Sequence, residues 1–431
     1  MPDRLGEICT LQGGFAFKSK DFCSDGVPVV KIADVTGGTS MEYHSMQCIP
    51  YKIAETAERF RTQESDTLIS MTGANVGKVT RVWPGEPMAL INQRVGRFVP
   101  KEPEKYSKDF IHYLVSSHEA YEFFRNAAYG SAQPNISGKL IESLPLPDLG
   151  SNSPTEIGAL LRALDDKIEL NRKTAATLEA MARALYRSWF VDFDPVAARS
   201  EGRAHAHMPP TTAALFPDRF GDDGLPEGWE IAPLSEMCDH VKKTVKPMEA
   251  PDQAFLHFSL PAYDAGKMPI AEPGDAIKSN KTFVPHDAIL FSRLNPTIPR
   301  VWWARTKGSE ATPASSTEFF IAKAHDPSET SWLYCALSSD EFREAACARV
   351  TGTSNSHQRI PPKALAEIEV IAPSPDVVSA FGELAGPWFE KIHAMASENQ
   401  NLAALRDTLL PRLMSGELRI GAAREQAEAA L

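Results

Sequence analysis

The 431-residue sequence predicts an α+β fold in which two similar globular domains are each followed by a long helix. Three observations support this prediction. Five short segments of the first half recur in the same order in the second half, the globular parts contain short runs of β-branched and aromatic residues, and each half ends with an apolar stripe at helical spacing. We therefore expect two pseudo-repeated α/β domains, separated by two long helices that pack together as an antiparallel coiled coil.

The internal repeat is the strongest observation, because five matching segments in one order seldom arise by chance. Residues 5–9 (LGEIC) match residues 234–238 (LSEMC), and residues 66–70 (DTLIS) match residues 287–291 (DAILF). The other three correspondences pair residues 129–136 with 351–360, residues 140–145 with 365–370, and residues 167–185 with 391–409. Each copy thus has a mixed globular part followed by a helical part.

Both globular parts contain short apolar runs of the kind that favours strands. The expected strands cover residues 27–32, 67–71, 95–99, 288–291 and 319–322. One helix-like segment lies near the end of each part, at residues 107–126 and 331–350. We expect a modest sheet in each domain.

Two apolar stripes with spacings of three and four residues predict two long amphipathic helices. Thr155, after the breaker run at residues 145–154, is the expected N-cap of the first. The packing residues expected in this helix are Leu161, Leu164, Ile168, Ala175, Leu178, Met181, Ala182 and Leu185, with Asn171 as the polar member. Those of the second are Trp388, Ile392, Met395, Leu402, Leu405, Leu409 and Leu413, with Asn399 as the polar member. Stripes of about 30 residues bury each other best as a helical pair.

These elements divide the chain into six parts. The expected boundaries are globular domains at residues 1–150 and 229–373, long helices at 151–196 and 374–421, a connector at 197–228 and a disordered tail at 422–431. The connector is rich in Pro, Gly and Asp, which indicates irregular structure. Helices packed separately on their own domains are the alternative, but the presence of two stripes favours the pair.

Composition and motifs argue against several classes of protein. The sequence has no apolar run long enough to span a membrane and no secretory signal, so we expect a cytoplasmic protein. Its six cysteines form no CxxC pair, and His205 and His207 lack a third metal ligand. Residues 73–79 resemble a phosphate-binding loop but lack its glycine spacing and its Ser or Thr. Asp165 and Asp166 are expected to be solvated helix charges, and no catalytic constellation is found.

Local charge favours a nucleic-acid ligand although the net charge of −11 argues against one. Residues 68–101 contain five basic residues and one acidic residue, and residues 276–308 contain six and one. Lys and Arg suit phosphate contacts, whereas Asn and Gln suit base edges. The candidate DNA-binding residues are Lys78, Arg81, Asn92, Gln93, Arg94, Arg97, Gln133, Asn135, Lys278, Lys281, Arg293, Asn295, Arg300, Arg305, Asn355, Gln358 and Arg359. The alternative for each is an ordinary solvated side chain.

Several long segments resemble one known family. Residues 164–196 (LDDKIELNRKTAATLEAMARALYRSWFVDFDPV), with LFPDRF and LPEGW after them, closely resemble the central conserved region of Type I restriction specificity subunits. Residues 405–420 (LRDTLLPRLMSGELRI) resemble the C-terminal conserved region of that family. Residues 130–136 (GSAQPNI) and 144–147 (LPLP) resemble the end of a target recognition domain. The resemblance covers the whole chain in order.

The resemblance implies a non-catalytic subunit of a restriction-modification complex, which defends a cell against foreign DNA. In the family, two target recognition domains each read one half of a split, asymmetric DNA site, and the helical pair sets their spacing. Two modification methyltransferase subunits, which carry S-adenosylmethionine and methylate adenine, dock on the helical regions, and motor nuclease subunits join for cleavage. The resemblance therefore implies no cofactor or metal on this chain, with S-adenosylmethionine, ATP and Mg on partner subunits.

Two departures from the family and two rival functions complete the sequence interpretation. The family usually has Glu-Gln shortly before the first long helix, where this chain has Thr155-Glu156-Ile157, and the first copy has no counterpart of the LPEGW at residues 225–229. The main rival is a duplicated protein-interaction scaffold that does not bind DNA, and the weaker one is a standalone enzyme. A methyltransferase gene beside the gene for this chain would favour the DNA reader over both.

Overall fold

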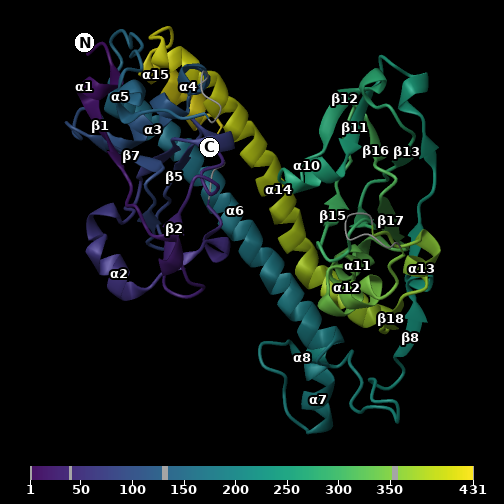
Figure 1. Cartoon of the computed structure of the whole chain (residues 1–431). Helices are drawn as coiled ribbons and strands as arrows, with labels where there is room; N and C mark the ends of the chain where they lie inside the picture. The colour runs from purple at the N-terminus through teal and green to yellow at the C-terminus, as the bar shows by residue number, and fades with distance from the viewer. Residues whose placement is uncertain (1, 38–40, 129–133, 352–357, 431) are drawn as a thin grey trace. The chain divides into compact units, whose positions relative to one another are not determined.

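The structure, a computed structural model, describes residues 2–37, 41–128, 134–351 and 358–430 (Figure 1). The chain forms two compact units: unit 1 comprises Met1–Asn171 and Ser397–Leu431, and unit 2 comprises Arg172–Ala396. Two long helices, α6 (Pro154–Phe190) and α14 (Pro375–Met414), each pass from one unit to the other. Each unit thus contains a globular part and a portion of both helices.

Unit 1 has a four-stranded antiparallel sheet with the strand order β1-β7-β4-β5 and a three-stranded sheet with the order β3-β2-β6. Its strands are β1 (Cys9–Gly13), β2 (Val27–Val30), β3 (Cys48–Ile49), β4 (Thr67–Ser70), β5 (Val79–Arg81), β6 (Leu90–Ile91) and β7 (Val95–Pro100). Its helices, besides the long pair, are α1 (Leu5–Ile8), α2 (Tyr51–Thr56), α3 (Lys108–Ser116), α4 (His118–Ala128), α5 (Gly138–Glu142) and α15 (Ile420–Glu428). The expected strands at 27–32, 67–71 and 95–99 correspond to β2, β4 and β7.

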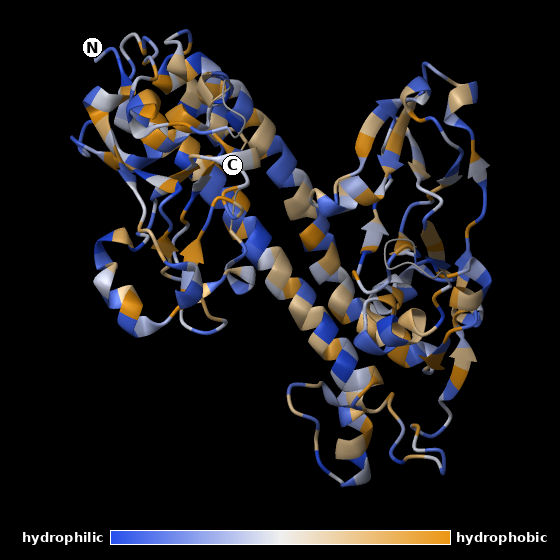
Figure 2. Cartoon of the chain, viewed as in Figure 1, coloured by the Kyte–Doolittle hydropathy of each residue, from blue (hydrophilic) through white to orange (hydrophobic). Residues whose placement is uncertain are grey.

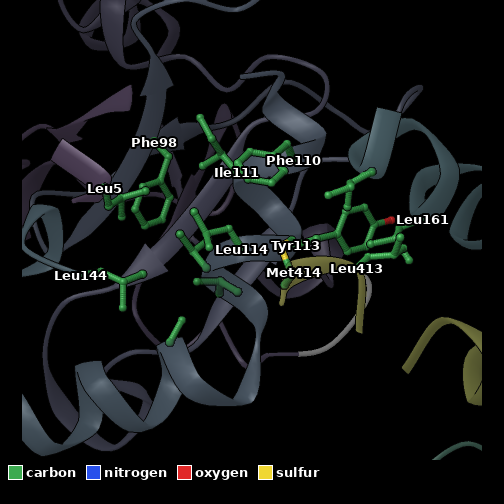
Figure 3. Close-up of a cluster of buried hydrophobic side chains, with 14 of the residues drawn as sticks. Leu5, Phe98, Phe110, Ile111, Tyr113, Leu114, Leu144, Leu161, Leu413 and Met414 are labelled. Carbon is green, nitrogen blue, oxygen red and sulfur yellow. The ribbon is translucent and has the colours of Figure 1, made fainter. Parts of the chain in front are cut away.

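The main core of unit 1 joins residues from both ends of the chain. Leu5, Phe98 and Phe110 are buried in the same cluster as Leu161 of α6 and Leu413 of α14. Figure 3 shows side chains of this cluster from α1, β7, α3 and both long helices. Residues after 397 are therefore part of the hydrophobic core of the first globular part.

Unit 2 has an antiparallel sheet with the order β15-β14-β17-β9, a five-stranded sheet with the order β10-β13-β16-β11-β12, and a β18-β8 pair. Its strands are β8 (Glu230–Pro233), β9 (Cys238–His240), β10 (Thr244–Val245), β11 (Ala254–Phe258), β12 (Ile270–Pro273), β13 (Lys281–Phe283), β14 (Ala288–Ser292), β15 (Val301–Ala304), β16 (Thr312–Ser315), β17 (Phe319–Ala324) and β18 (Glu369–Ala372). Its shorter helices are α7 (Asp194–Ser200), α8 (Pro210–Ala213), α9 (Leu234–Met237), α10 (Leu260–Asp264), α11 (Thr330–Leu337), α12 (Asp340–Cys347) and α13 (Pro362–Ala366). The expected strands at 288–291 and 319–322 correspond to β14 and β17.

Aromatic side chains dominate the core of unit 2. The ring centroid of Phe381 in α14 lies 5.9 Å from the ring centroid of Trp189 and 5.5 Å from that of Phe190, both in α6. Phe216 and Trp229, at the connector and its end, are also buried in this core. The connector therefore packs on unit 2, although much of it is irregular as expected.

The two long helices contact each other within each unit. In unit 1, Asn171 donates hydrogen bonds to Glu398 (2.7 Å) and Asn399 (2.9 Å), and Arg406 donates to Asp165 (2.6 Å). Hydrophobic and hydrophilic residues alternate along both helices in Figure 2. Most of the expected packing residues are buried or half-buried, namely Leu161, Leu164, Ile168, Leu178, Leu185, Trp388, Ile392, Met395, Leu402, Leu405 and Leu409. Met181 is the exception: it is 46% exposed, so it is not a core residue of the helix pair, and its contact with a partner subunit stays a prediction.

The ends of several helices differ from the sequence prediction. Residues 107–126 and 331–350 each form two helices, because Ser117 and Ser339 accept hydrogen bonds from the backbone N–H groups of Ala120 and Phe342 and so begin a second helix. The first long helix begins at Pro154, whose ring suits the first helical turn, and Thr155 is inside it. The long helices end at Phe190 and Met414, short of the expected 196 and 421.

The C-terminal segment is ordered, contrary to the expected tail at 422–431. Residues 420–428 form α15, whose Ala423 and Ala427 are buried in the unit 1 core. Asn152 donates to the carbonyls of Leu413 (3.3 Å) and Leu418 (2.8 Å) and accepts from the N–H of Ile420 (3.1 Å). Small residues at helical spacing were too weak a signal to predict this helix.

Gly416 makes the turn between α14 and α15. Its φ is +68°, in the left-handed region that glycine adopts readily. A Cβ at this position would lie 2.9 Å from the backbone nitrogen of Gly150, so the turn also needs the absence of a side chain.

None of the described helices has the length and apolar character required to cross a membrane.

Candidate nucleic-acid interface

Three segments of unit 1 meet beside the carboxyl end of β4. The backbone N–H of Met71 donates to the carbonyl of Arg94 (3.0 Å), and the N–H of Ile136 donates to the carbonyl of Met71 (2.9 Å). The N–H of Gly73 donates to the carbonyl of Pro134 (3.1 Å). We call this meeting point junction 1, formed by residues 71–75, 92–94 and 134–136.

Three segments of unit 2 meet in the same way beside the carboxyl end of β14. The N–H of Arg293 donates to the carbonyl of Glu318 (2.8 Å), and the N–H of Ile360 donates to the carbonyl of Arg293 (3.0 Å). The N–H of Asn295 donates to the carbonyl of Gln358 (2.9 Å). We call this meeting point junction 2, formed by residues 293–298, 316–318 and 358–360.

Two further details recur at the junctions. Gly73 and Asn295 both have positive φ, +78° and +49°, which Gly and Asn tolerate better than other residues. The hydroxyl of Ser70 donates to the carbonyl of Thr72 (3.2 Å), as that of Ser292 donates to the carbonyl of Leu294 (2.9 Å). The two junctions therefore share backbone conformation as well as hydrogen bonds.

Junction 1 presents polar side chains to solvent. Gln93, Arg94 and Asn135 are exposed, and Asn92 is half-buried with its Oδ1 accepting from the N–H of Gln93 (2.7 Å). Arg94 thus offers a cation, and Gln93 and Asn135 offer amides, at one surface. Gln133, another candidate, lies outside the described residues.

Junction 2 combines cations with an acidic residue. Arg359 makes a two-point ion pair with Glu318, through Nε to Oε2 (3.0 Å) and Nη2 to Oε1 (2.7 Å). Burial lowers the pKa of Arg293, and the negative charge of Glu318 partly offsets this lowering. Gln358 and Asn295 are half-buried. Asn355 lies outside the described residues.

Two of the candidate cations in unit 1 have a structural role instead. Arg81 is 1% exposed and pairs with Asp109 (2.8 Å), and Arg97 is 7% exposed and pairs with Asp66 (3.0 Å). Their assignment to DNA contact is wrong because both side chains are buried, Arg81 beside Asp109 of α3 and Arg97 against the segment before β4, where it donates to the carbonyls of Arg59 and Arg61. Lys78 is half-buried.

Three candidate cations of unit 2 are also held within the protein. Burial lowers the pKa of Lys281, whose Nζ donates to Ser279 (2.8 Å). Arg300 pairs with Asp264 through Nε (2.7 Å) and Nη2 (2.8 Å), and Arg305 pairs with Glu390 of α14 (2.6 and 2.7 Å). Lys281 is buried, so its assignment to DNA contact is wrong, whereas Arg300 and Arg305 are half-buried and their contact with DNA stays a prediction. Lys278 is exposed and donates to the carbonyl of Asp275.

The sequence prediction missed Glu318. This residue immediately precedes β17, as Arg94 precedes β7, so aligning the two strands of the repeat would have identified it as a junction residue. Among the residues that the structure describes, no group of three or more His, Cys, Asp or Glu side chains is placed to hold a metal ion.

Comparisons with known proteins point in one direction. Residues 2–180 match the family model described as the Type I restriction modification DNA specificity domain. The chain is 27% identical to the Type I restriction enzyme HindI specificity subunit of Haemophilus influenzae over 72% of this chain and 77% of that protein. It is 23% identical to the MjaIX specificity subunit of Methanocaldococcus jannaschii over 97% of this chain and 93% of that protein.

One solved structure has a similar fold. The S subunit of a Type I restriction-modification system from M. genitalium superposes with a TM-score of 0.55, covering 95% of this chain and 94% of that one at 15% identity. At this level of identity the similarity concerns the fold alone.

Proposed function

We propose that this chain, like the Type I restriction enzyme specificity subunits that it resembles, is a non-catalytic subunit that recognises DNA sequence. Its two globular parts each read one half of a bipartite, asymmetric DNA site. The recognition domains comprise residues 1–150 and 229–373. The partners are double-stranded DNA, two methyltransferase subunits and the motor nuclease subunits. This proposal gives each junction the same task on a different half-site.

The recurrence of the junction is the observation that carries the proposal. The sheets β1-β7-β4-β5 and β9-β17-β14-β15 have the same strand order and the same antiparallel pairing. Three backbone hydrogen bonds then join equivalent segments in both units. A duplicated DNA reader needs such a scaffold twice, with different side chains on it, because the two half-sites differ.

The long helices supply the proposed spacer and docking surface. The contacting pairs Asp165–Arg406, Asn171–Asn399 and Trp189–Phe381 run in opposite directions along the two helices, as an antiparallel coiled coil requires. Helices of 37 and 40 residues are ~55 to 60 Å long, more than the ~34 Å of one turn of B-DNA. Their length is therefore sufficient to set the distance between two half-sites, and their exposed faces remain for the methyltransferase subunits.

Exchange of one recognition domain tests the proposed function. The full chain with residues 1–145 replaced by those of a relative with different specificity is co-expressed with its methyltransferase subunits, and methylated adenines are mapped across the host genome. We expect one half of the bipartite methylated sequence to change completely while the other half and the spacer stay the same. Exchange of residues 229–373 is the matched control and should change the other half. A sequence unchanged by both exchanges would contradict the proposal.

Arg94 is predicted to contact a phosphate, since it is exposed at junction 1. The Arg94→Ala variant should bind all DNA sequences more weakly, and the slope of log K against log salt should become shallower by about 0.9 for one lost phosphate contact. Fluorescence anisotropy at several salt concentrations measures this. Arg81→Ala is the control: its side chain is buried, so it should lower thermal stability and leave the slope of the folded complex unchanged.

A further inference from the structure

The backbone of Arg359 is fixed from two sides. Its N–H donates to the carbonyl of Thr351 (3.2 Å) and its carbonyl accepts from the N–H of Thr351 (2.9 Å). On its other side it forms a β-bridge with Leu294. The direction in which this side chain leaves the backbone is thus determined before any ligand binds.

The guanidinium of Arg359 is fixed as well. Glu318, whose side chain is 21% exposed, accepts from Nε and from Nη2, whereas the Arg359 side chain is 54% exposed. These contacts use the side edge of the guanidinium. The end edge, formed by Nη1 and the second hydrogen of Nη2, is directed away from Glu318. A pair of parallel donors on an exposed, oriented edge matches the O6 and N7 acceptors of guanine in the major groove.

Asn135 occupies the same place in junction 1. It forms a β-bridge with Thr72 as Arg359 does with Leu294, and the following residues, Ile136 and Ile360, make equivalent hydrogen bonds. Asn135 is exposed, and its amide has one donor and one acceptor, which match N7 and N6 of adenine.

The residue opposite this position also differs between the junctions. Arg94 in junction 1 takes the place of Glu318 in junction 2, as the equivalent hydrogen bonds from Met71 and Arg293 show. A carboxylate is therefore present where the reading residue is an arginine and is replaced by a cation where the reading residue is an asparagine. In each junction the partner suits the residue beside it: an anion orients the guanidinium of Arg359, whereas the neutral amide of Asn135 needs no anionic partner.

We infer that residues 359 and 135 are equivalent specificity-determining positions, Arg359 reading a guanine in one half-site and Asn135 an adenine in the other, with Glu318 as a positioning residue for Arg359. The inference rests on the proposed function and goes beyond it by assigning a base to one residue in each domain. It also explains why a duplicated scaffold recognises an asymmetric site.

A randomised DNA library tests the inference. The full chain, in complex with its methyltransferase subunits, selects duplexes in which all positions of both half-sites are randomised, and the bound DNA is sequenced. Wild-type protein should enrich a guanine at one position in the half-site read by unit 2. Arg359→Ala should abolish this preference alone and weaken binding of the best sequence by roughly 5- to 150-fold, as expected for one bidentate base contact.

Two further variants separate base reading from a phosphate contact. Arg359→Lys keeps the charge but not the fork, so it should fail to restore the guanine preference. Glu318→Gln should reduce the preference in part, because Arg359 loses its anionic partner. In the other half-site, Asn135→Ala should remove the preference for adenine at one position. Arg219→Ala, which removes another exposed arginine paired with a glutamate, Glu227, is the control and should change no base preference.

The outcomes that overturn the inference are distinct from failure of the proposed function. A uniform loss of affinity in Arg359→Ala, or rescue by Arg359→Lys, would assign Arg359 to a phosphate. A retained guanine preference in Arg359→Ala would exclude it as the reader. A variant that loses enrichment in both half-sites is misfolded. If Arg359→Ala misfolds, the guanine preference of Glu318→Gln, which keeps the size of the side chain, tests the inference instead. If wild-type protein enriches no bipartite sequence, the proposed function itself is wrong.

Discussion

Replacing Asp165 with alanine is expected to destabilise unit 1 by about 3 to 5 kcal/mol, the usual cost of removing one partner of a buried ion pair. Asp165 is 6% exposed. Its carboxylate accepts from Tyr113 Oη of α3 (2.6 Å) and from Arg406 Nη1 of α14 (2.6 Å). It thus joins three helices of unit 1 at one point.

The groups around Asp165 show why the loss is large. Burial, and then the charge of Asp165, raises the pKa of Tyr113, so the phenol stays protonated and donates. Burial disfavours the cation of Arg406, but Asp165 and Asp407 outweigh this and raise its pKa. Without Asp165, a half-buried arginine and a buried phenol lose their shared acceptor.

Hydrogen exchange of the full-length protein, followed by mass spectrometry, localises the effect. In Asp165→Ala, amides of α3 and of the first half of α6 should lose protection, whereas those of β14 in unit 2 should not. Asp166→Ala is the matched control, because Asp166 is half-exposed and pairs with Arg162 on its own helix; it should cost about 0.5 kcal/mol or less. Equal effects of the two variants would show that the Asp165 network does not hold the helices.

Replacing Phe381 with alanine is expected to destabilise unit 2 by about 3 to 5 kcal/mol, because it leaves a cavity among aromatic rings. Phe381 is fully buried on α14. Its ring lies within 6.2 Å of those of Tyr186, Trp189 and Phe190, all of α6. The substitution therefore removes three aromatic contacts between the long helices in unit 2.

The same exchange measurement applies to this variant. Amides at the end of α6 and the start of α14 should lose protection, while those of β7 in unit 1 should keep it. Leu384→Ala, one turn along the same helix, is the matched control because Leu384 is 39% exposed; its effect should be below about 1 kcal/mol. Loss of protection in unit 1 alone would contradict the assignment of Phe381 to the core of unit 2.

The contrast between Asp165 and Asp166 shows what a sequence pattern can determine. Helical periodicity predicted two long helices, which α6 and α14 confirm, and most residues of their apolar stripes are buried or half-buried. It could not show that Asp165 is buried, because its partners, Tyr113 and Arg406, lie 52 residues before it and 241 residues after it. Pairing between distant segments is a property of the tertiary structure, and a carboxylate beside an apolar stripe is usually solvated.

The count of basic residues over residues 68–101 and 276–308 had the same limitation. Charge counting identified the regions around both junctions but treated Arg81, Arg94 and Arg97 alike. Arg94 lies in a turn and is exposed, whereas the other two lie in β5 and β7 and are neutralised by Asp109 and Asp66. Their burial depends on helix α3 and on the loop before β4, whose positions no local pattern reveals. The junction hydrogen bonds, which involve only backbone atoms, left no trace in side-chain composition.

The shared core of unit 1 has a consequence for biosynthesis. During translation, residues 172–396 leave the ribosome before residues 397–431, and they already form a complete compact unit. The first globular part, made earlier, must wait for Leu402, Leu409 and Leu413, which fill its interior. Unit 2 is therefore completed before unit 1, although the first globular part is synthesised first. Until residues 397–431 emerge, the apolar stripe of nascent unit 1 lacks its partner and is a binding surface for chaperones.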